Sequence, residues 1–324
     1  MTDTDVDILV RREGTEGLST AAYAETLRER LPDHRVVHAT TPEEERRYVE
    51  SARIVTGNAI DERLLDAAER LELFACTFAG TDHLPKDLLL DRGVAVTNAS
   101  GIHAPGIAEQ ALGQMLVFAR GLHEAWRRQQ RSEWRHFRPG EFTDSTVAVV
   151  GLGAIGQALT QRLRGMEVDT IGVRYTPEKG GPTDEVVGFD AAAVHDALAR
   201  ADYVVLACPL TETTRSLIDR KALSTMKPSS VLINMARGGV VDTDALVDAL
   251  QTQQIRGAAL DVTDPEPLPE AHPLWTLENC HVTPHVGGHT PKHWDRLADI
   301  LAENVERLDD DAELRNLVFG PDDS

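Results

Sequence analysis

One segment of this 324-residue chain constrains its fold more than any other. The apolar run Val147–Val150 leads directly into the sequence GLGAIG at residues 151–156, and a helical pattern follows from Gln157 to Arg164. Glycines at this spacing permit a tight turn, close approach of a pyrophosphate to the backbone, and close packing of strand on helix. The segment predicts a doubly wound α/β domain that binds a dinucleotide. The residues expected to contact the dinucleotide are Gly151, Gly153, Ala154, Ile155 and Gly156.

Short β-type runs alternate with helical patterns along the rest of the chain, which predicts parallel sheets covered by helices. The runs before the glycine motif are residues 6–10, 35–38, 53–56, 73–77 and 94–97, with helices expected at 20–31 and 62–71. The later runs are residues 146–150, 170–173, 203–207, 231–235, 257–260 and 281–283. A chain of this length exceeds what one core usually organises, so we expect two doubly wound parallel-sheet domains.

Two long helical patterns suggest where the domains meet. Apolar residues recur at helical spacing from Ala104 to Arg127, which predicts one helix that crosses between domains. The segment Trp294–Arg307 is also amphipathic, and we expect it to return to the first domain. The expected domains are therefore 1–98 with 291–324, which is discontinuous, and a dinucleotide-binding domain, 99–290. The acidic stretches Asp309–Asp311 and Pro321–Ser324 are expected to be a solvated tail.

The charge balance excludes some classes of partner. Acidic residues outnumber basic ones 53 to 33, which gives a net charge of -20. Such a surface repels nucleic-acid phosphates and anionic membranes, so we expect neither as a partner. Arginine carries most of the positive charge, since only five lysines occur: Lys86, Lys179, Lys221, Lys227 and Lys292. Crowded acidic groups that need ions to screen them suggest a halophilic protein.

The spacing of the cysteines and the composition of the first residues indicate in which cellular compartment the protein is expected. Cys76, Cys208 and Cys280 are an odd set without close spacing, and each lies in or beside an apolar run. Structural disulfides and thiolate metal sites are therefore not expected. The acidic start, Met1–Asp7, has no apolar targeting segment, and no run is long enough to cross a bilayer. We expect a soluble protein of the cytoplasm, with no bound metal.

The strand after the glycine motif ends at Val173, and Arg174, Tyr175 and Thr176 follow it. In an NAD-binding domain, an acidic residue at this place holds the ribose diol. A guanidinium instead pairs with the extra 2′-phosphate of NADP, and the two hydroxyls can add contacts. We therefore expect NADP as the preferred cofactor. The alternative is an ordinary surface arginine in an enzyme that accepts NAD as well.

Three later segments carry a recognisable pattern: Asn234–Gly239 (NMARGG), Asp261–Pro267 (DVTDPEP) and Thr283–Gly288 (TPHVGG). In order and residue type they resemble the D-2-hydroxyacid dehydrogenases, as do the glycine motif and residues 208–211 (CPLT). The resemblance spans nearly the whole chain. It implies a Rossmann cofactor domain inserted into a flavodoxin-like substrate domain, and a 2-keto or 2-hydroxy acid as substrate.

Each of the three segments follows an expected strand, and ligands bind at the carboxyl ends of strands in open α/β sheets. Reduction of a 2-keto acid places a hydride on the carbonyl carbon, and the carbonyl oxygen then needs a proton. His285 is the natural donor, because histidine titrates near neutral pH. Glu266 would fix the imidazole tautomer and favour its charged form. Arg237 would hold the substrate carboxylate and polarise the keto oxygen.

The resemblance implies further contacts. Backbone amides of Phe78, Ala79 and Gly80 would bind the substrate carboxylate, although the loop 78–83 (FAGTDH) is less rich in glycine than the family's usual loop. Phe78 either shapes the substrate pocket or packs in the core. Asp261 would accept a hydrogen bond from the nicotinamide carboxamide. The remaining cofactor contacts that the resemblance implies are Cys208, Pro209, Ala236 and Gly287. Asn98, His103 and Glu109 lie near the expected hinge and are not assigned a specific role.

The resemblance also leaves assembly and substrate open. Trp126 and Trp134 follow the long helix where this family commonly forms its dimer, so we expect a homodimer, with packing within one chain as the alternative. Within the same fold, a glyoxylate or hydroxypyruvate reductase and a phosphoglycerate dehydrogenase without its regulatory domain are alternatives. The cations Arg11, Arg12 and Lys86 do not look clustered for a phosphorylated substrate. An alternative of another class is a dinucleotide-sensing interaction protein that resembles corepressors of this fold.

Overall fold

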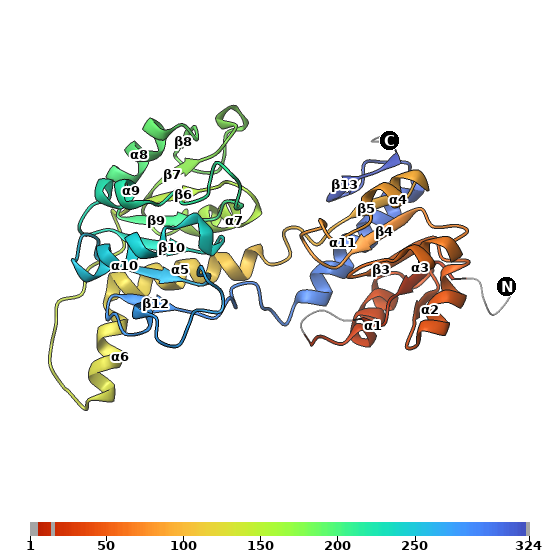
Figure 1. Cartoon of the computed structure of the whole chain (residues 1–324), viewed down its shortest axis with the longest axis horizontal. Helices are drawn as coiled ribbons and strands as arrows, with labels where there is room; N and C mark the ends of the chain where they lie inside the picture. Colours follow the sequence, from red (N-terminus) through yellow and green to blue (C-terminus); the bar gives the residue numbers. More distant parts are fainter. Residues whose placement is uncertain (1–5, 14–16, 322–324) are drawn as a thin grey trace. The chain divides into compact units, whose positions relative to one another are not determined.

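The structure is a computed structural model that describes residues 6–13 and 17–321. It divides into two compact units, which we call unit 1 (Met1–Ile102 with Thr290–Ser324) and unit 2 (His103–His289). The boundaries expected from the sequence, after residues 98 and 290, lie four residues and one residue away. Both units are α/β, with parallel sheets covered by helices on two faces (Figure 1). Asp309–Asp311 is not part of a tail as expected, because Asp309 ends the helix His293–Asp309 and pairs with Arg53, and the strand Leu317–Phe319 follows. Of the expected tail Pro321–Ser324, residues 322–324 lie outside the described residues.

Unit 1 contains a six-stranded sheet of order β13-β5-β4-β3-β1-β2. Its parallel strands are β1 (Ile8–Val10), β2 (Val36–His38), β3 (Ile54–Gly57), β4 (Leu73–Cys76) and β5 (Ala95–Thr97). β13 (Leu317–Phe319) pairs antiparallel with β5 at the edge. The helices are α1 (Thr20–Arg30), α2 (Pro42–Val49), α3 (Glu62–Ala67), α4 (Lys86–Asp91) and α11 (His293–Asp309).

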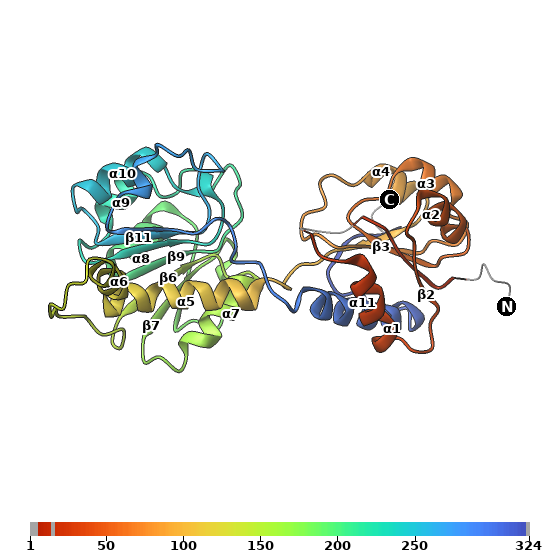
Figure 2. The same cartoon turned by 90° about the horizontal axis from the view of Figure 1, so that it is seen from below.

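Alternate strand residues of unit 1 enter two different cores. Ile8 and Val10 pack with α1 and α11, whereas Leu9 packs with α2, α3 and α4. This alternation places α1 and α11 on one face of the sheet, as Figure 2 shows. The two helices contact each other through the rings of Tyr23 and Trp294, which stack with centroids 4.6 Å apart. The C-terminal helix is therefore a core element of unit 1.

The amphipathic pattern of α11 explains its packing. Leu297 and Leu301 are buried, whereas Asp295 and Asp299 are exposed and form ion pairs with Arg30 of α1. α11 and α5 each have 17 residues. Crossing a bilayer takes about 20 apolar residues. Within residues 6–13 and 17–321, no helix is long and apolar enough for this.

Unit 2 contains a seven-stranded parallel sheet of order β12-β11-β10-β9-β6-β7-β8. Its strands are β6 (Thr146–Val150), β7 (Asp169–Val173), β8 (Glu185–Val187), β9 (Tyr203–Leu206), β10 (Val231–Asn234), β11 (Gly257–Leu260) and β12 (Cys280–Val282). From β6 the chain builds outward through β7 and β8, and it then returns to the other side of β6 to form β9. The carboxyl ends of β6 and β9 therefore flank the point where strand order reverses, which is the usual ligand crevice.

Helices cover both faces of this sheet. α5 (Ala104–Arg120) and α7 (Ala154–Leu163) pack on the face that contains Val147 and Val149. α8 (Ala191–Arg200), α9 (Arg220–Thr225) and α10 (Thr243–Gln251) pack on the face that contains Ala148 and Val150. The central strands β6, β9, β10 and β11 are buried on both sides, which explains why they read as continuous apolar runs in the sequence.

The prediction of a single helix from Ala104 to Arg127 is wrong. α5 ends at Arg120, and a separate helix, α6 (Leu122–Gln130), begins after Gly121. Gly121 has φ +63°, a left-handed conformation that ends helices. A Cβ atom there would also lie 2.7 Å from the Phe137 ring. The periodicity analysis missed the break because apolar residues continue at helical spacing beyond it. The strands β8 and β13 were not predicted either, since β8 is only partly buried and β13 is mostly exposed, so neither gives an apolar run.

Candidate active site

The glycines of the GLGAIG turn are required by the backbone that surrounds them. Gly151 has φ +103°, and a Cβ atom on it would lie 2.7 Å from the carbonyl of Ala207. A Cβ atom on Gly156 would lie 2.0 Å from the Gly151 oxygen, so α7 approaches β6 at the closest distance that a glycine allows. Gly153 has no atom within 4 Å of its Cβ direction, which leaves space at the start of α7. This is the geometry expected of a pyrophosphate-binding turn.

A cavity of about 480 Å³ opens beside this turn, at the carboxyl ends of β6, β7 and β9. Seven of the residues predicted to bind the cofactor line the cavity: Gly151, Gly153, Arg174, Tyr175, Thr176, Cys208 and Pro209. The other seven lining residues were not predicted for the cofactor: Leu152, Lys179, Phe189, Ala207, Thr211, Thr213 and Thr214. Six predicted residues do not line it: Ala154, Ile155, Gly156, Ala236, Asp261 and Gly287.

The charges of this cavity fit an anionic ligand. Arg174 and Lys179 line it, and no residue that the structure describes as lining it is acidic. Arg174 also donates a hydrogen bond from Nη1 to the Gly180 carbonyl. Burial raises the pKa of the Cys208 thiol to about 11, so Cys208 contributes an uncharged wall. The turn, the cations and the cavity together fit a nicotinamide dinucleotide.

His285 and Glu266 contact each other at the carboxyl ends of β11 and β12, on the side of the sheet away from β7 and β8. His285 follows β12, Glu266 follows β11, and His285 Nδ1 lies 2.6 Å from Glu266 Oε1. A carboxylate only accepts hydrogen bonds, so Nδ1 donates and Nε2 is left to exchange a proton. Both side chains are partly exposed, at 49% and 42%, and are therefore accessible to a substrate.

The backbone holds His285 in an uncommon conformation. Its φ is +52°, in the left-handed region that non-glycine residues adopt uncommonly, and seven other described non-glycine residues share a positive φ. The His285 amide donates to the carbonyl of Asp261 at 2.8 Å. This bond ties the turn that carries His285, after β12, to the residue that follows β11.

Asp261 ties these two strand ends together. Its carboxylate is almost fully buried and accepts hydrogen bonds from Gln110 Nε2 (2.8 Å), the Val286 amide (3.2 Å), the Gly287 amide (2.8 Å) and the Thr283 hydroxyl. Oδ1 accepts three of these bonds and Oδ2 only the one from the Gly287 amide, whereas each carboxylate oxygen has about two acceptor positions. Oδ2 is therefore the atom with a position left for the predicted bond from the nicotinamide carboxamide. Gln110 was not predicted, because a single glutamine on an apolar helix forms no motif.

Arg237 lies on the loop that follows β10, and its side chain is exposed. The buried Asn234 braces this loop through Nδ2, which donates to the Arg237 carbonyl at 3.0 Å, and through Oδ1, which accepts from the Ala236 amide. A Cβ atom on Gly238 would lie 1.9 Å from the Thr263 oxygen. The Arg237 loop therefore packs backbone to backbone on the loop that carries Glu266. Because β10, β11 and β12 are neighbours, all three predicted catalytic residues lie at adjacent strand ends of unit 2.

The predicted substrate loop, Phe78–Gly80, belongs to unit 1 and follows β4. Its conformation is fixed by the Asn98 side chain, which donates to the Ala79 carbonyl at 2.6 Å, and by the Ala99 amide, which donates to the Phe78 carbonyl. Phe78 is 37% exposed and its ring lies edge-on to His83, so it is not a core residue.

Glu109 of unit 2, to which no specific role was assigned, forms an ion pair with Arg162 at 2.9 Å.

The expectation that the cations of unit 1 are not clustered is partly wrong. A cavity of about 250 Å³ is lined by four arginines, Arg11, Arg12, Arg46 and Arg63, together with Glu13, Glu45 and Asp61. The buried Glu45 pairs with both Arg11 and Arg12, so these acids offset most of the positive charge. Lys86 is elsewhere, over the Phe319 ring. The sequence did not show the cluster because it joins three separate segments.

Comparisons with known proteins agree with this site. A family model described as "D-isomer specific 2-hydroxyacid dehydrogenase, NAD binding domain" matches residues 112–287. Human glyoxylate reductase/hydroxypyruvate reductase is 36% identical over 254 residues, which cover 76% of this chain and 76% of that protein. The D-3-phosphoglycerate dehydrogenase of Methanocaldococcus jannaschii is 33% identical over 78% of this chain, but this chain spans only 48% of its length.

A solved structure extends the similarity to nearly the whole chain. The D-isomer specific 2-hydroxyacid dehydrogenase of Xanthobacter autotrophicus, in complex with NADPH and MES, superimposes with a TM-score of 0.77 at 26% identity. The match covers 97% of this chain and 98% of that one. From the glycine turn to the His285 loop, sequence, geometry and comparisons agree that the chain belongs to the family of D-isomer specific 2-hydroxyacid dehydrogenases.

Proposed function

We propose that this dehydrogenase reduces 2-keto carboxylic acids reversibly to D-2-hydroxy acids, with His285 as the general acid and base. The observation that carries the proposal is the 2.6 Å contact between His285 and Glu266, in the unit that also contains the dinucleotide cavity. A paired imidazole with one free ring nitrogen suits a reaction that must move one proton at neutral pH.

The roles of the protein groups follow from this pairing. When bound, the dinucleotide supplies the hydride. His285 Nε2 gives its proton to the carbonyl oxygen, and the Nδ1–H bond to Glu266 keeps the ring oriented as its charge disappears. Arg237 pairs with the substrate carboxylate and offers a fixed cation to the oxygen that gains negative charge. In the reverse direction, His285 takes the proton from the hydroxyl.

Replacement of His285 tests the proposal. His285→Ala should lose on the order of 10²-fold or more in kcat, as removal of a general acid usually does. Binding of NADPH, measured by its fluorescence, should stay within about twofold, because His285 does not line the dinucleotide cavity. Near-normal turnover in this variant would refute the assignment.

The substrate itself is settled by a panel. The experiment measures the rate at which NADPH and NADH are consumed with each candidate substrate: pyruvate, 2-ketobutyrate, longer and branched 2-keto acids, glyoxylate, hydroxypyruvate and phosphohydroxypyruvate. Chiral analysis of the product then tests the D configuration. Phosphohydroxypyruvate should be a poor substrate, because the arginines of the unit 1 cavity are largely offset by Glu13, Glu45 and Asp61. If no 2-keto acid is reduced, the alternative of a dinucleotide-sensing interaction protein gains support.

We also propose that NADP is preferred over NAD. Arg174 lines the dinucleotide cavity at the end of β7, where an NAD enzyme would place an acidic residue. In Arg174→Asp, the ratio of kcat/KM for NADPH to kcat/KM for NADH should fall to about one or below, so that the preference for NADPH is lost or reversed. Arg164→Asp is a control with the same charge change, since Arg164 is exposed at the C-terminal end of α7, away from the glycine turn at its N-terminal end. An unchanged ratio in Arg174→Asp would contradict the preference.

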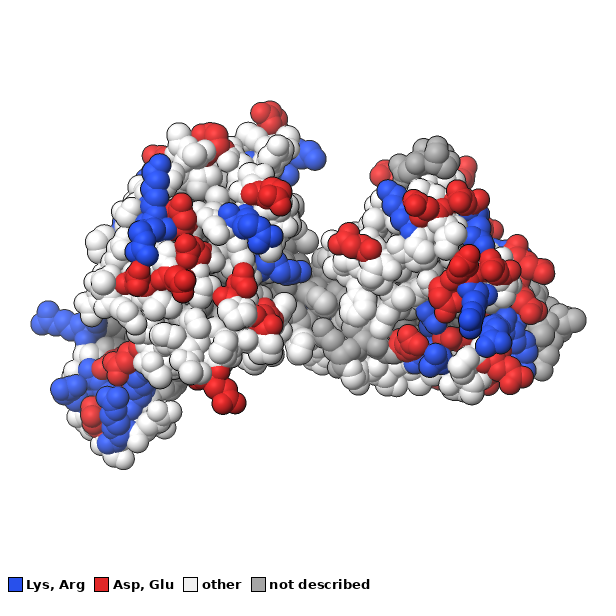
Figure 3. Space-filling model, viewed as in Figure 1, with Lys and Arg blue, Asp and Glu red and all other residues white. Residues whose placement is uncertain are grey.

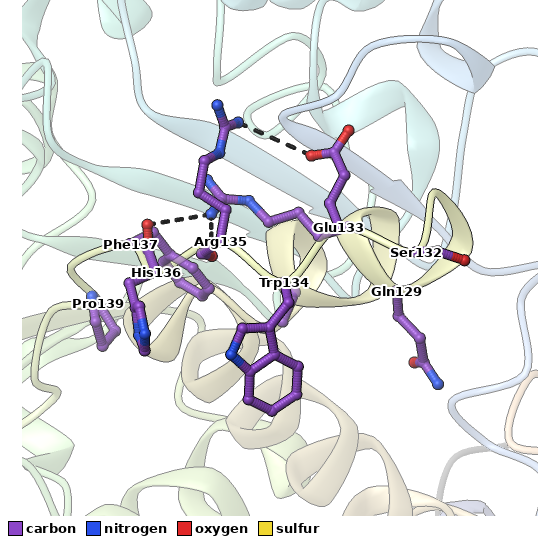
Figure 4. A pocket seen from close by; sticks show the side chains of 10 residues that line it. Gln129, Ser132, Glu133, Trp134, Arg135, His136, Phe137 and Pro139 are labelled. Atoms are coloured by element: carbon purple, nitrogen blue, oxygen red, sulfur yellow. Dashed lines mark hydrogen bonds and ion pairs between the residues drawn. The ribbon is translucent and has the colours of Figure 1, made fainter.

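We propose that the chain forms a homodimer through α6 and the loop after it, residues 122–139, which we call the arm. Trp126 is 51% exposed and Trp134 is 95% exposed, and arm residues line a cavity of about 710 Å³ (Figure 4). The arm contains five arginines and two glutamates, in a chain of net charge -20. Basic side chains gather over it in Figure 3. A second copy of this acidic chain offers the complementary charge.

Light scattering tests this assembly. The double variant Trp126→Ser/Trp134→Ser should shift the molar mass from that of a dimer toward that of a monomer, because aromatic residues dominate such contacts. Trp275→Ser is the matched control, as Trp275 is 48% exposed and lies outside the arm. A monomeric wild-type protein, or a dimer unaffected by the double variant, would contradict the proposal.

We further propose that the protein works in a reducing cytoplasm. Its three cysteines, Cys76, Cys208 and Cys280, are buried and unpaired, and burial raises the pKa of each thiol. Thiol titration of denatured protein prepared without reductant should therefore find three free thiols. Fewer than three would show that a disulfide forms in the native chain.

A further inference from the structure

The dinucleotide cavity contains a second cation, Lys179, that no motif indicates. Lys179 ends a short 3-10 helix, Pro177–Lys179, which starts directly after the Arg174–Thr176 segment. Gly180 closes this turn with φ +60°, and its amide donates to the Pro177 carbonyl at 2.9 Å. The tight turn returns the chain to the cavity, so Arg174 and Lys179 line the same space although five positions separate them.

Arg174 holds this turn in place. It is half-buried, and its Nη1 donates to the carbonyl of Gly180, the residue after Lys179. The Arg174 amide is fixed in turn by the Val187 carbonyl of β8 at 3.1 Å. Nη1 is therefore used inside the protein, whereas Nε and Nη2 have no hydrogen-bond partner among the described residues. Arg174 thus has two tasks, since the same guanidinium also borders the cavity.

Lys179 is free to meet a ligand. Its side chain is exposed, and it forms no ion pair with any residue in the described part of the chain. The lining residues described above include four threonines, Thr176, Thr211, Thr213 and Thr214, but no acid that could neutralise the two cations. An unpaired ammonium beside a guanidinium favours a ligand that brings at least two negative charges. A phosphate monoester carries about -1.5 to -2 at neutral pH.

We propose that Lys179 and Arg174 together bind the adenosine 2′-phosphate of NADP, and that Arg174 positions Lys179 through its bond to Gly180. This inference rests on the proposed NADP preference and adds a second specificity-determining residue to it. Arginine provides planar, paired donors and lysine a compact point charge, so the two cations complement each other around one phosphate. Loss of Arg174 should therefore also remove much of the contribution of Lys179, whereas loss of Lys179 leaves Arg174 in place.

Two ligand fragments separate this contact from the rest of the cofactor. Adenosine 2′,5′-bisphosphate and adenosine 5′-monophosphate differ only in the 2′-phosphate, and calorimetry measures their affinities without any turnover. Lys179→Gln should weaken binding of the bisphosphate about 5- to 10-fold, as expected for one charge-assisted contact at a partly solvated site, and change binding of the monophosphate less than about twofold. Lys221→Gln is the matched control, because Lys221 is exposed on α9, outside the cavity.

A double variant tests the coupling. Arg174→Gln should weaken bisphosphate binding more than Lys179→Gln does, and Arg174→Gln/Lys179→Gln should be little weaker than Arg174→Gln alone. Fully additive effects would show that Arg174 does not position Lys179. Unchanged bisphosphate binding in Lys179→Gln, or equal loss for both ligands, would overturn the role of Lys179.

Failure of this inference can be distinguished from failure of the proposed cofactor preference. If wild-type protein binds the bisphosphate no better than the monophosphate, the NADP preference itself is wrong. If wild-type protein prefers the bisphosphate and Lys179→Gln retains that preference in full, only the role of Lys179 is wrong. Neither result depends on which 2-keto acid is reduced.

Discussion

His285 shows how single residues of this site are held in place by others. Its left-handed backbone is fixed by the Asp261 carbonyl, and its ring is fixed by Glu266. Asp261 and Asn234 use their side chains to secure loop backbone, and both are nearly inaccessible to solvent. The catalytic residues are therefore positioned by buried, hydrogen-bonded polar groups, which is the usual basis of a preorganised site.

The contact between Glu266 and His285 leads to a prediction about rate. Glu266→Gln keeps the size of the side chain but removes the charge that stabilises the imidazolium, so kcat should fall by about 10²-fold. Affinity for NADPH, measured separately by fluorescence, should change little. The control is Glu270→Gln, an exposed glutamate four positions along the same segment. Equal kcat for Glu266→Gln and wild type would show that the carboxylate charge is not used.

Gly238 allows a second prediction at this scale. An added Cβ atom would lie 1.9 Å from the Thr263 oxygen, so the loops of Arg237 and Glu266 must separate in Gly238→Ala. We expect a loss of about 1–3 kcal/mol in the free energy of unfolding, together with lower kcat. Gly165→Ala is the control, since Gly165 has open space around its Cβ direction. Equal thermal stability of the two variants would contradict this account.

The sequence predicted the residues of the site that carry distinctive chemistry. Arg237, Glu266 and His285 stand in short segments whose order and type are specific, and their strand ends proved to be adjacent. Gln110, Lys179 and Asn234 were not assigned roles. Their function depends on which backbone atoms or cavities they reach, and a side chain's reach becomes known only when turns such as 177–180 are placed in space.

At the scale of elements, the junction of α5, α6 and β12 brings two histidines together. His123 of α6 and His281 of β12 have ring centroids 5.4 Å apart, and both rings contact Phe118 of α5. Burial lowers the pKa of His281 to about 4, and the nearby His123 and Arg127 act in the same direction. Burial also lowers the pKa of His123, with Arg127 and Arg256 adding to the effect, while the hydrogen bond to the Val117 carbonyl and the Glu124 carboxylate oppose it. The junction therefore favours the neutral form of both imidazoles.

This junction predicts that acid destabilises unit 2. An unfolded histidine binds its proton near pH 6.5, whereas folded His281 binds one only near pH 4, so the unfolded state gains protons first as the pH falls. The free energy of unfolding should decrease from about pH 6.5 to about pH 4, by on the order of 2 kcal/mol after allowance for partial exposure. His281→Asn should reduce this decrease in urea titrations across the range. The exposed His136→Asn is the control, and identical pH profiles for wild type and His281→Asn would contradict the prediction.

The elements that were predicted and those that were missed differ in length and burial. Strands such as β6 and β10 were found because they are apolar on both faces. β8 has only partly buried residues and β13 is mostly exposed, so neither gives a clear pattern. The break between α5 and α6 depends on a single glycine in a left-handed conformation. Hydrophobic periodicity cannot register a change of direction when the apolar residues continue past it.

Over the whole molecule, charge is distributed unevenly. The chain has a net charge of -20, yet the arm and the dinucleotide cavity carry an excess of cations. Many arginines elsewhere form ion pairs with carboxylates, such as Arg30 with Asp295 and Asp299. Such exposed pairs contribute about 0–1 kcal/mol each, which leaves most of the repulsion among the remaining acids uncompensated.

This repulsion predicts salt-dependent stability, as expected of a halophilic protein. Dissolved ions shorten the range of charge interactions, so Tm should rise by more than about 5 °C between 0.1 M and 3 M KCl, which corresponds to roughly 1–2 kcal/mol. Differential scanning calorimetry across this range gives the measurement, with sucrose as a control for non-ionic effects. A Tm that does not change with KCl would contradict the prediction.

The discontinuity of unit 1 has a consequence for biosynthesis. The core of unit 1 combines Tyr23 and Leu27 of α1 with Trp294, Leu297 and Leu301 of α11, and β13 completes its sheet. Unit 2 is continuous in sequence, so all of its strands are synthesised before α11. Because domains fold as their residues emerge, unit 2 completes its core first. Unit 1, although its first strand is made earliest, must wait for the last helix, and the part of its sheet that α11 covers stays exposed until then.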